Sequence, residues 1–188
     1  MPSGGRHEMN ILTVNLILST VIFAIVAKLY LIPALPRLEL RTVVLPILLL
    51  HAMRHLGLMF LAPGAVFPGI PAQFAYPAAF GDLITAVLAV IAIVAVVRNS
   101  NLARPLVGLF NVVGALDLID AIALATIYGA APHMGPAYWI PAFWVPALLV
   151  THYVVFVLLG KRWTGPMCAS EQLIVHACND AYEAMSSP

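Results

Sequence analysis

The stretch LPILLLHAMRHLGLMFLA, residues 45–62, decides what kind of protein this sequence encodes. It is long and apolar enough for an α-helix to cross the hydrocarbon core of a bilayer, which takes about 20 residues. Its middle nevertheless carries His51, Arg54 and His55, and ionisable side chains are costly to bury in lipid. A helix of this composition is marginal in a membrane by itself, so it needs polar partners on other helices.

The composition of the whole chain is typical of a membrane protein. Of its 188 residues, 62% are hydrophobic and only 9% are charged, whereas about a quarter of the residues of a soluble domain are charged. Only helices or closed barrels span lipid, and no ten-residue alternation indicates a barrel. The sequence therefore predicts an all-α integral membrane protein, a bundle of five transmembrane helices at residues 10–32, 42–61, 74–97, 105–128 and 138–159.

The Lys and Arg residues lie beside alternate loops. Arginines flank the first and third loops, Lys161 and Arg162 follow the last helix, and the second and fourth loops hold neither residue type. By the positive-inside rule, the N-terminus is expected outside and the C-terminus in the cytoplasm, with the bacterial inner membrane as the expected location. We expect a transmembrane domain over residues 1–160 and a cytoplasmic tail over 161–188 that contains a short amphipathic helix.

Several classes of function are disfavoured. The net charge is only +1 and no basic run is present, so nucleic acid is not an expected partner. The chain has no GxSxG, phosphate-loop or CxxC motif, which disfavours serine hydrolysis, nucleotide use and thiol redox chemistry. The expected partners are the lipid bilayer and either further copies of the chain or a larger membrane complex.

Ionisable residues of three expected helices fall at similar depths. Asp82 lies in the third helix, and Asp117 and Asp120 share a face of the fourth because they are three residues apart. At 1.5 Å per residue, these carboxylates, His51 and His55 lie between about 9 and 17 Å from the outer ends of their helices. We therefore expect the histidines and Arg54 to face the carboxylates across the bundle interior.

The charge balance of this cluster points to a proton or a metal ion. Three carboxylates meet one arginine, so two negative charges remain if all three ionise, and bound protons or a divalent cation would balance them. The spacing of His51 and His55 lets two imidazoles hold one metal, with Asp82 or Asp120 as a third ligand. We expect zinc or iron at this site, and the candidate catalytic residues are Asp82, Asp117, Asp120 and Arg54.

The sequence leaves several functions open. The first, and the function that we favour, is a metal-binding membrane enzyme, a hydrolase or an oxidoreductase, with its His/Asp site in the outer half of the bundle, that acts on a lipidic or small apolar substrate. In the second, His152 of the fifth helix pairs with His51 or His55 to bind haem b in a haem or quinone protein. In the third, the Asp and His groups relay protons or a cation in a small transporter. In a purely structural alternative, Arg54 and an Asp form a buried ion pair that fixes helix packing.

Overall fold

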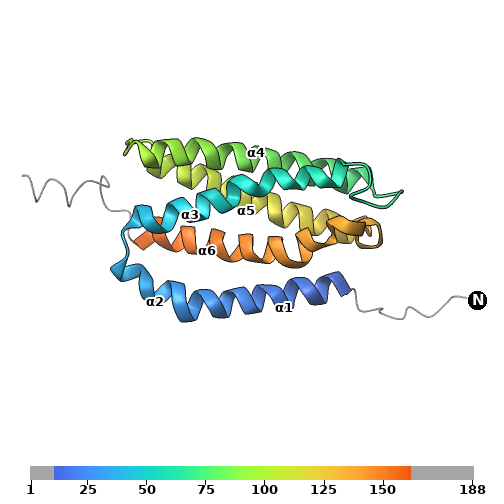
Figure 1. Cartoon of the computed structure of the whole chain (residues 1–188), viewed down its shortest axis with the longest axis horizontal. Helices are drawn as coiled ribbons and strands as arrows, with labels where there is room; N and C mark the ends of the chain where they lie inside the picture. The colour runs from blue at the N-terminus through green and yellow to red at the C-terminus, as the bar shows by residue number, and fades with distance from the viewer. Residues whose placement is uncertain (1–10, 162–188) are drawn as a thin grey trace, which may run out of the picture.

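A computed structural model describes residues 11–161 of the chain, and its regular elements over this range are helices. Five helical segments are long and apolar enough to cross a membrane, which confirms the predicted all-α bundle; they are Ile11–Arg37, Leu40–Leu61, Ala72–Val97, Ala103–Ile127 and Gly135–Gly160. Each segment runs antiparallel to the next, so Ile11 and Lys161 lie at opposite ends of the bundle (Figure 1). The predicted helix in the tail lies outside the described residues.

The first segment is longer than predicted because it continues through a proline. It consists of α1 (Ile11–Val26), a π-helical turn (Ala27–Leu31), α2 (Ile32–Ala34) and a 3-10 turn (Leu35–Arg37). Pro33 lacks an amide N–H and its ring crowds the carbonyl four residues earlier. The wider π turn lies at that point and accommodates the ring.

The second segment changes its winding halfway along. It begins as α3 (Leu40–Ala52) and continues as a 3-10 helix, Met53–Leu61. A 3-10 helix has three residues per turn, so every third residue lies on the same face, and the buried residues Arg54, Gly57 and Phe60 follow that period. His55 lies one position off this face and is exposed. The prediction that His55 faces the interior together with Arg54 is therefore wrong.

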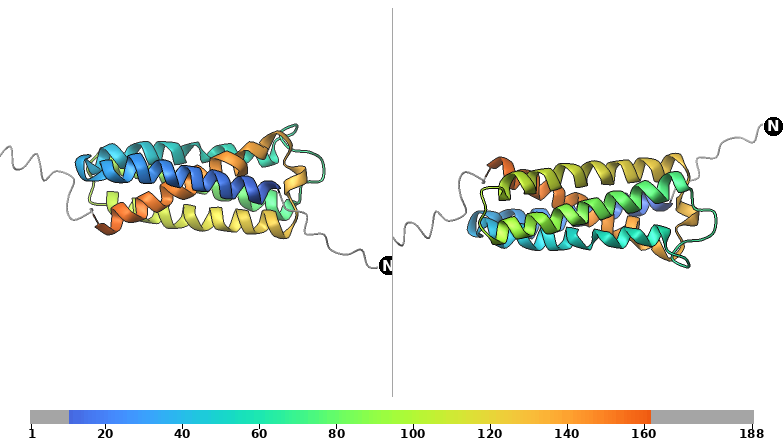
Figure 2. Two further views of the ribbon diagram at one scale, coloured as in Figure 1. Left: turned by 90° about the horizontal axis from the view of Figure 1, so that it is seen from below. Right: turned by 90° about the horizontal axis from the view of Figure 1, so that it is seen from above.

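The remaining helices are α4 (Ala72–Val97), α5 (Ala103–Ile127) and α6 (Val145–Lys161), and a π-helical turn (Ile140–Trp144) leads into α6. Helix α4 packs against α5, α3 and the 3-10 helix, whereas α1 packs against α6 and the π-helical turn before it. Figures 1 and 2 show α1 at the margin of the bundle. The interior face of α4 is rich in small residues, which allow the close approach of neighbouring helices: Ala75, Ala78, Ala79, Ala86, Ala89, Ala92 and Ala95 are all buried.

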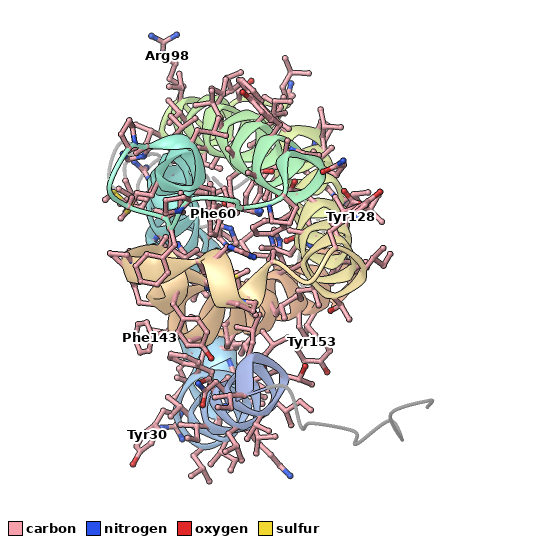
Figure 3. All side chains as sticks on the ribbon, turned by 90° about the vertical axis from the view of Figure 1, so that its right-hand side faces the viewer. Tyr30, Phe60, Arg98, Tyr128, Phe143 and Tyr153 are labelled. Atoms are coloured by element: carbon pink, nitrogen blue, oxygen red, sulfur yellow. The ribbon has the colours of Figure 1, made fainter. Side chains whose placement is uncertain are left out.

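The two ends of the bundle differ in charge. One end, which we call the arginine end, holds Arg37, Arg41, Arg98 and Arg104 beside its two connections. The other end, the cap end, carries residues 62–71 and 128–139, which contain no Lys or Arg. The two cap segments are joined by backbone hydrogen bonds of 2.9 Å, from Phe67 N to His133 O and from Ala137 N to Ala65 O. Figure 3 views the bundle along its axis, with Phe60 directed inward and Arg98 outward.

A polar layer separates two hydrophobic cores. The core at the arginine end includes Val44, Leu48 and Phe110, and the core at the cap end includes Phe74 and Leu118. Between them lie the buried polar side chains of the described chain: His51, Arg54, Asp82, Thr85, Asn111 and His152. Each of the four helical segments that surround the interior contributes to this layer at the point where it passes from one core to the other. The fold therefore gathers polar residues from distant parts of the sequence at one level.

Candidate functional site

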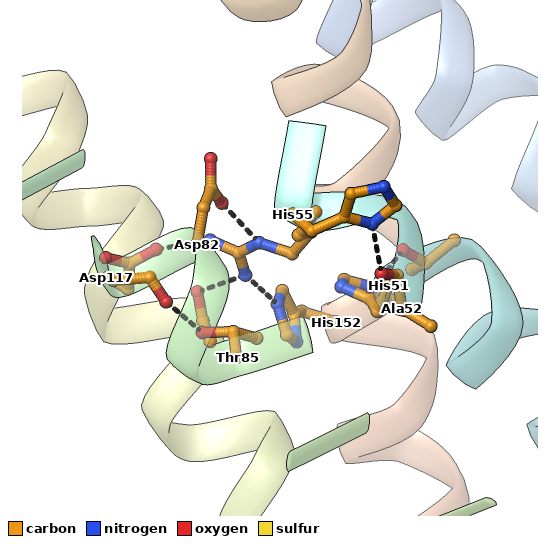
Figure 4. Close-up of polar contacts among 11 residues, drawn as sticks. His51, Ala52, His55, Asp82, Thr85, Asp117 and His152 are labelled. Carbon is orange, nitrogen blue, oxygen red and sulfur yellow. Dashed lines mark hydrogen bonds and ion pairs between the residues drawn. The ribbon is translucent and has the colours of Figure 1, made fainter. Parts of the chain in front are cut away.

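Arg54 occupies the centre of the polar layer and is 1% exposed. Its Nε donates a hydrogen bond of 2.6 Å to Asp82 Oδ1, and Nη2 donates to Asp117 Oδ2 (Figure 4). Its Nη1 donates to the backbone oxygen of Gly114 at 3.1 Å. The prediction that Arg54 is the counter-charge of an Asp on the third or fourth helix is confirmed, and the structure shows that both helices supply one.

His152 is held in one orientation by Asn111. The Asn111 side-chain Nδ2 donates to the backbone oxygen of His152 at 3.2 Å, so its Oδ1 is the atom turned to the ring, where it lies 2.8 Å from Nδ1. This assignment makes Nδ1 the protonated nitrogen of a neutral His152, since an amide oxygen only accepts. The other nitrogen, Nε2, then presents a lone pair to Arg54 Nη1, 3.4 Å away.

His51 is fully buried and has one nitrogen without a partner in the described chain. Its Nε2 lies 2.9 Å from the hydroxyl of Thr151, which donates its own proton to a backbone carbonyl of α6. The hydroxyl must therefore accept from Nε2–H, which leaves the lone pair of Nδ1 without a hydrogen bond. The two imidazoles contact each other with ring centroids 4.2 Å apart. His51 thus presents a buried, unpaired hydrogen-bond acceptor beside the ion-pair network.

The network carries an excess of one negative charge when both of its carboxylates are ionised. Arg54 supplies one positive charge to Asp82 and Asp117, and both histidines are neutral in the tautomers assigned above. Asp120 does not join them, because its side chain is exposed on the outer face of α5. The expectation that three carboxylates face Arg54 is therefore wrong, because only Asp82 and Asp117 do so among the described residues. A single proton or a monovalent cation is enough to balance the charge.

Three glycines make room for the network. A Cβ on Gly57 would overlap the side chain of Asp82, and one on Gly81 would overlap the carboxylate of Asp117. A Cβ on Gly114 would lie 2.7 Å from His152 Cε1, and the backbone oxygen of the same residue accepts from Arg54. The sequence did not identify Gly57 or Gly81 as part of the site, and a lone glycine in a span gives no signal of what lies against it. On the sides that face these three glycines, the network is therefore packed directly against backbone.

A cavity of about 210 Å³ adjoins the network on the side of the cap end. Asp82 is the one ionisable residue among its described lining residues. The rest are mostly apolar and come from α1, the 3-10 helix, α4, α5, the cap segment 128–139, the π-helical turn before α6 and the first residue of α6. Phe60 and Phe74 stand in its wall in an edge-to-face contact, with ring centroids 5.1 Å apart. We call this space the outer cavity. It places an apolar space in contact with one carboxylate of the network.

The described residues do not form the metal site expected from the sequence. His55 is exposed and its Nδ1 lies 3.0 Å from the backbone oxygen of Ala52, whereas His51 is buried beside His152. Over residues 11–161, no group of three or more His, Cys, Asp or Glu side chains is placed to hold a metal ion. The roles of His51, His55, Asp82 and Asp120 as metal ligands stay predictions that this geometry does not favour.

The arrangement is also unlike a haem site. The rings of His51 and His152 are in direct contact at 4.2 Å, and their Nε2 atoms face Thr151 and Arg54. Two axial ligands of one haem must instead lie on opposite faces of the macrocycle. The role of His152 as a haem ligand therefore gains no support from its surroundings.

Comparison with known proteins adds a family but no function. No curated protein and no solved structure matches the chain. One family model nevertheless matches the part of the chain that contains the polar layer, the outer cavity and the cap. Residues 11–160 match the model of the family described as Domain of unknown function (DUF8737), and the chain belongs to that family.

Proposed function

We propose that the chain is an integral membrane protein that moves a small molecule together with a proton or a cation. The observation that carries this proposal is the sharing of one buried arginine by two carboxylates, one of which also borders an apolar cavity. Ionisable residues inside a membrane span are expensive and usually mark a substrate or ion pathway. In this chain they come from three of the five helical segments and meet at one level.

The proposed orientation places the cap end outside and the arginine end in the cytoplasm. It rests on the positive-inside rule and on the clustering of the arginines of the described loops at one end of the bundle. A periplasmic-only reporter fused after residue 188 is expected to stay silent, and the same reporter inserted in the loop at Gly64 is expected to be active. Gly64 lies in a cap segment with nothing within 4 Å of its ideal Cβ, so the insertion should be tolerated. The reverse pattern would contradict the orientation.

The charge balance of the network supplies a reason to couple a substrate to a proton. In a low-dielectric interior, an uncompensated charge is strongly disfavoured, and Arg54 balances only one of its two carboxylates. A proton or a cation that arrives through the outer cavity meets Asp82 first, because Asp82 lines the cavity while Arg54 is 1% exposed. Binding there neutralises the site, and neutralisation lowers the cost of any movement of the network.

The core at the arginine end separates the network from the cytoplasmic side. Val44, Leu48, Val96, Val107 and Leu158 are all fully buried there. With the cavity on the cap side of the network and this apolar core on the other side, we take the described arrangement to be one state of a carrier that is sealed towards the arginine end. Transport requires that this apolar core opens while the cap closes, which is a movement between two packings of the same helices.

Transport can be tested before the substrate is known. We expect proteoliposomes on a solid-supported electrode to give a current when a small-molecule extract of the source cells is added, and the current to depend on the pH gradient. Asp82→Asn should reduce the current at least ten-fold, because a carboxamide stays neutral and cannot bind and release a proton as a carboxylate does. Asp120→Asn, which changes an exposed carboxylate outside the network, should leave it unchanged. Equal currents from the wild type and Asp82→Asn would contradict the proposal.

A further inference from the structure

We propose that the outer cavity binds a protonated amine with a compact apolar body, and that its ammonium group docks on Asp82. The inference rests on the proposed function only in taking this amine to be the transported substrate. The binding itself is argued from the volume, the walls and the charge of the cavity.

The size of the cavity limits the body of the ligand. An engineered cavity of about 150 Å³ in another protein holds one benzene molecule, and the outer cavity measures about 210 Å³. It therefore accommodates one six-membered ring with a side chain of about two or three atoms. A fatty-acyl chain or a polycyclic molecule exceeds this volume.

The walls favour an aromatic or alicyclic body. Phe60 and Phe74 are buried in the cavity wall, and Leu16, Leu118 and Ile140 line it as well. Phenyl side chains already in edge-to-face contact offer a further ring the same geometry, which contributes about 0.5–1.5 kcal/mol per aromatic pair beyond area burial. The polar atoms of the wall are few, so a ligand with several hydroxyl groups would lose hydrogen bonds to water on entry.

Asp82 determines the head group. Its Oδ1 accepts from Arg54, whereas Oδ2 packs beside Gly57 and accepts no hydrogen bond from the described residues. Figure 4 shows this second oxygen directed away from Arg54. An ionised carboxylate only accepts hydrogen bonds, so this oxygen calls for a donor. An ammonium group donates to it and also balances the excess negative charge of the network, and charge-assisted hydrogen bonds are about twice as strong as neutral ones.

Other head groups fit less well. An anion would approach two carboxylates, and the described lining residues include no Lys or Arg to attract it. A neutral alcohol can donate one hydrogen bond but leaves the negative charge in place. The hydroxyl of Thr126 donates to Ile122 O at 2.8 Å, so it offers the ligand an acceptor rather than a second donor. A cation that donates hydrogen bonds is the class that meets both requirements.

The full chain in nanodiscs allows a direct test with one matched pair of probes. Titration calorimetry would compare 2-phenylethylamine with 2-phenylethanol at pH 7, with empty nanodiscs subtracted for partition into lipid. We expect the wild type to bind the amine at least ten-fold more tightly than the alcohol. Asp82→Asn should remove this preference while the asparagine oxygen still accepts from Arg54, and Asp120→Asn should retain it.

A second pair of variants tests the place of binding without changing charge. Ala121→Phe fills the outer cavity from α5 and should abolish binding of both probes, whereas Ala123→Phe adds the same side chain on the exposed face of that helix and should have no effect. Amine binding that survives Ala121→Phe, or equal affinity of the wild type for the two probes, would overturn the inference. Binding of the amine without any transport current would support the inference and contradict the proposed function. A transport current from cell extract without binding of the amine would support the proposed function and contradict the inference.

Discussion

Replacing Arg54 by leucine is expected to remove most of the folded protein. The change strands Asp82 and Asp117 in the polar layer, where Arg54 Nε and Nη2 now meet them, and it also leaves the backbone oxygen of Gly114 without its donor. Removing one partner of a buried ion pair costs about 3–5 kcal/mol, which is a large part of a typical folding free energy of about 5–15 kcal/mol. The measurement is the yield of monodisperse protein in detergent and its melting temperature.

Restoring neutrality should rescue the variant in steps. Arg54→Leu combined with either Asp82→Asn or Asp117→Asn should recover part of the folded yield, and the triple variant should recover most of it. Arg98→Leu is the matched control, because Arg98 is an exposed arginine at the end of α4, and it should leave the yield unchanged. A triple variant no better than Arg54→Leu alone would show that charge balance is not what Arg54 provides.

Two glycines on α5 should respond to the same substitution with opposite signs. A Cβ on Gly114 would lie 2.7 Å from both His152 Cε1 and Thr85 Cγ2, so Gly114→Ala forces the polar layer apart; overpacking of this kind costs about 1–3 kcal/mol. A Cβ on Gly108 would meet nothing within 4 Å. Gly108→Ala should therefore stabilise by up to about 1 kcal/mol, because alanine favours a helix interior over glycine.

The pair is best compared by thermal unfolding in one detergent. We expect the melting temperature of Gly114→Ala to fall and that of Gly108→Ala to stay level or rise. The binding of 2-phenylethylamine can be compared in the same two variants, because Gly114 packs against the network and a Cβ on Gly108 would meet nothing within 4 Å. If both variants melt at the same temperature, the tight packing described around Gly114 is wrong.

The sequence was sufficient for the bundle because a single property dominates it. Long apolar segments separated by turn residues must form helices, because a helix satisfies all of its backbone hydrogen bonds within one segment. Five such segments were predicted, and five are found among the described residues. Their ends were predicted less well where prolines occur. The first helix was predicted to end at residue 32, directly before Pro33, but a π-helical turn lets the helical segment continue to Arg37.

The sequence predicted the centre of the site but not its limits. The cost of burying Arg54 required a carboxylate partner, and two were found. The exposure of His55 could not be predicted, because an α-helix with 3.6 residues per turn was expected where the chain forms a 3-10 helix with three. Asp117 and Asp120 lie about 60° apart on α5, at 100° per residue, and only the first reaches the interior. The surrounding glycines depend on contacts between helices, which periodicity within one helix does not reveal.

The 3-10 winding of Met53–Leu61 also sets a length. Such a helix rises about 2.0 Å per residue, against 1.5 Å in an α-helix, so nine residues extend about 4.5 Å further than the same residues would as α-helix. The segment joins Arg54 at one end to the cap at the other. Rewinding it as α-helix would draw the cap towards the ion pairs by about that distance and would rotate Phe60 out of line with Arg54. The change in winding would therefore shorten the outer cavity and move its aromatic wall in a single step.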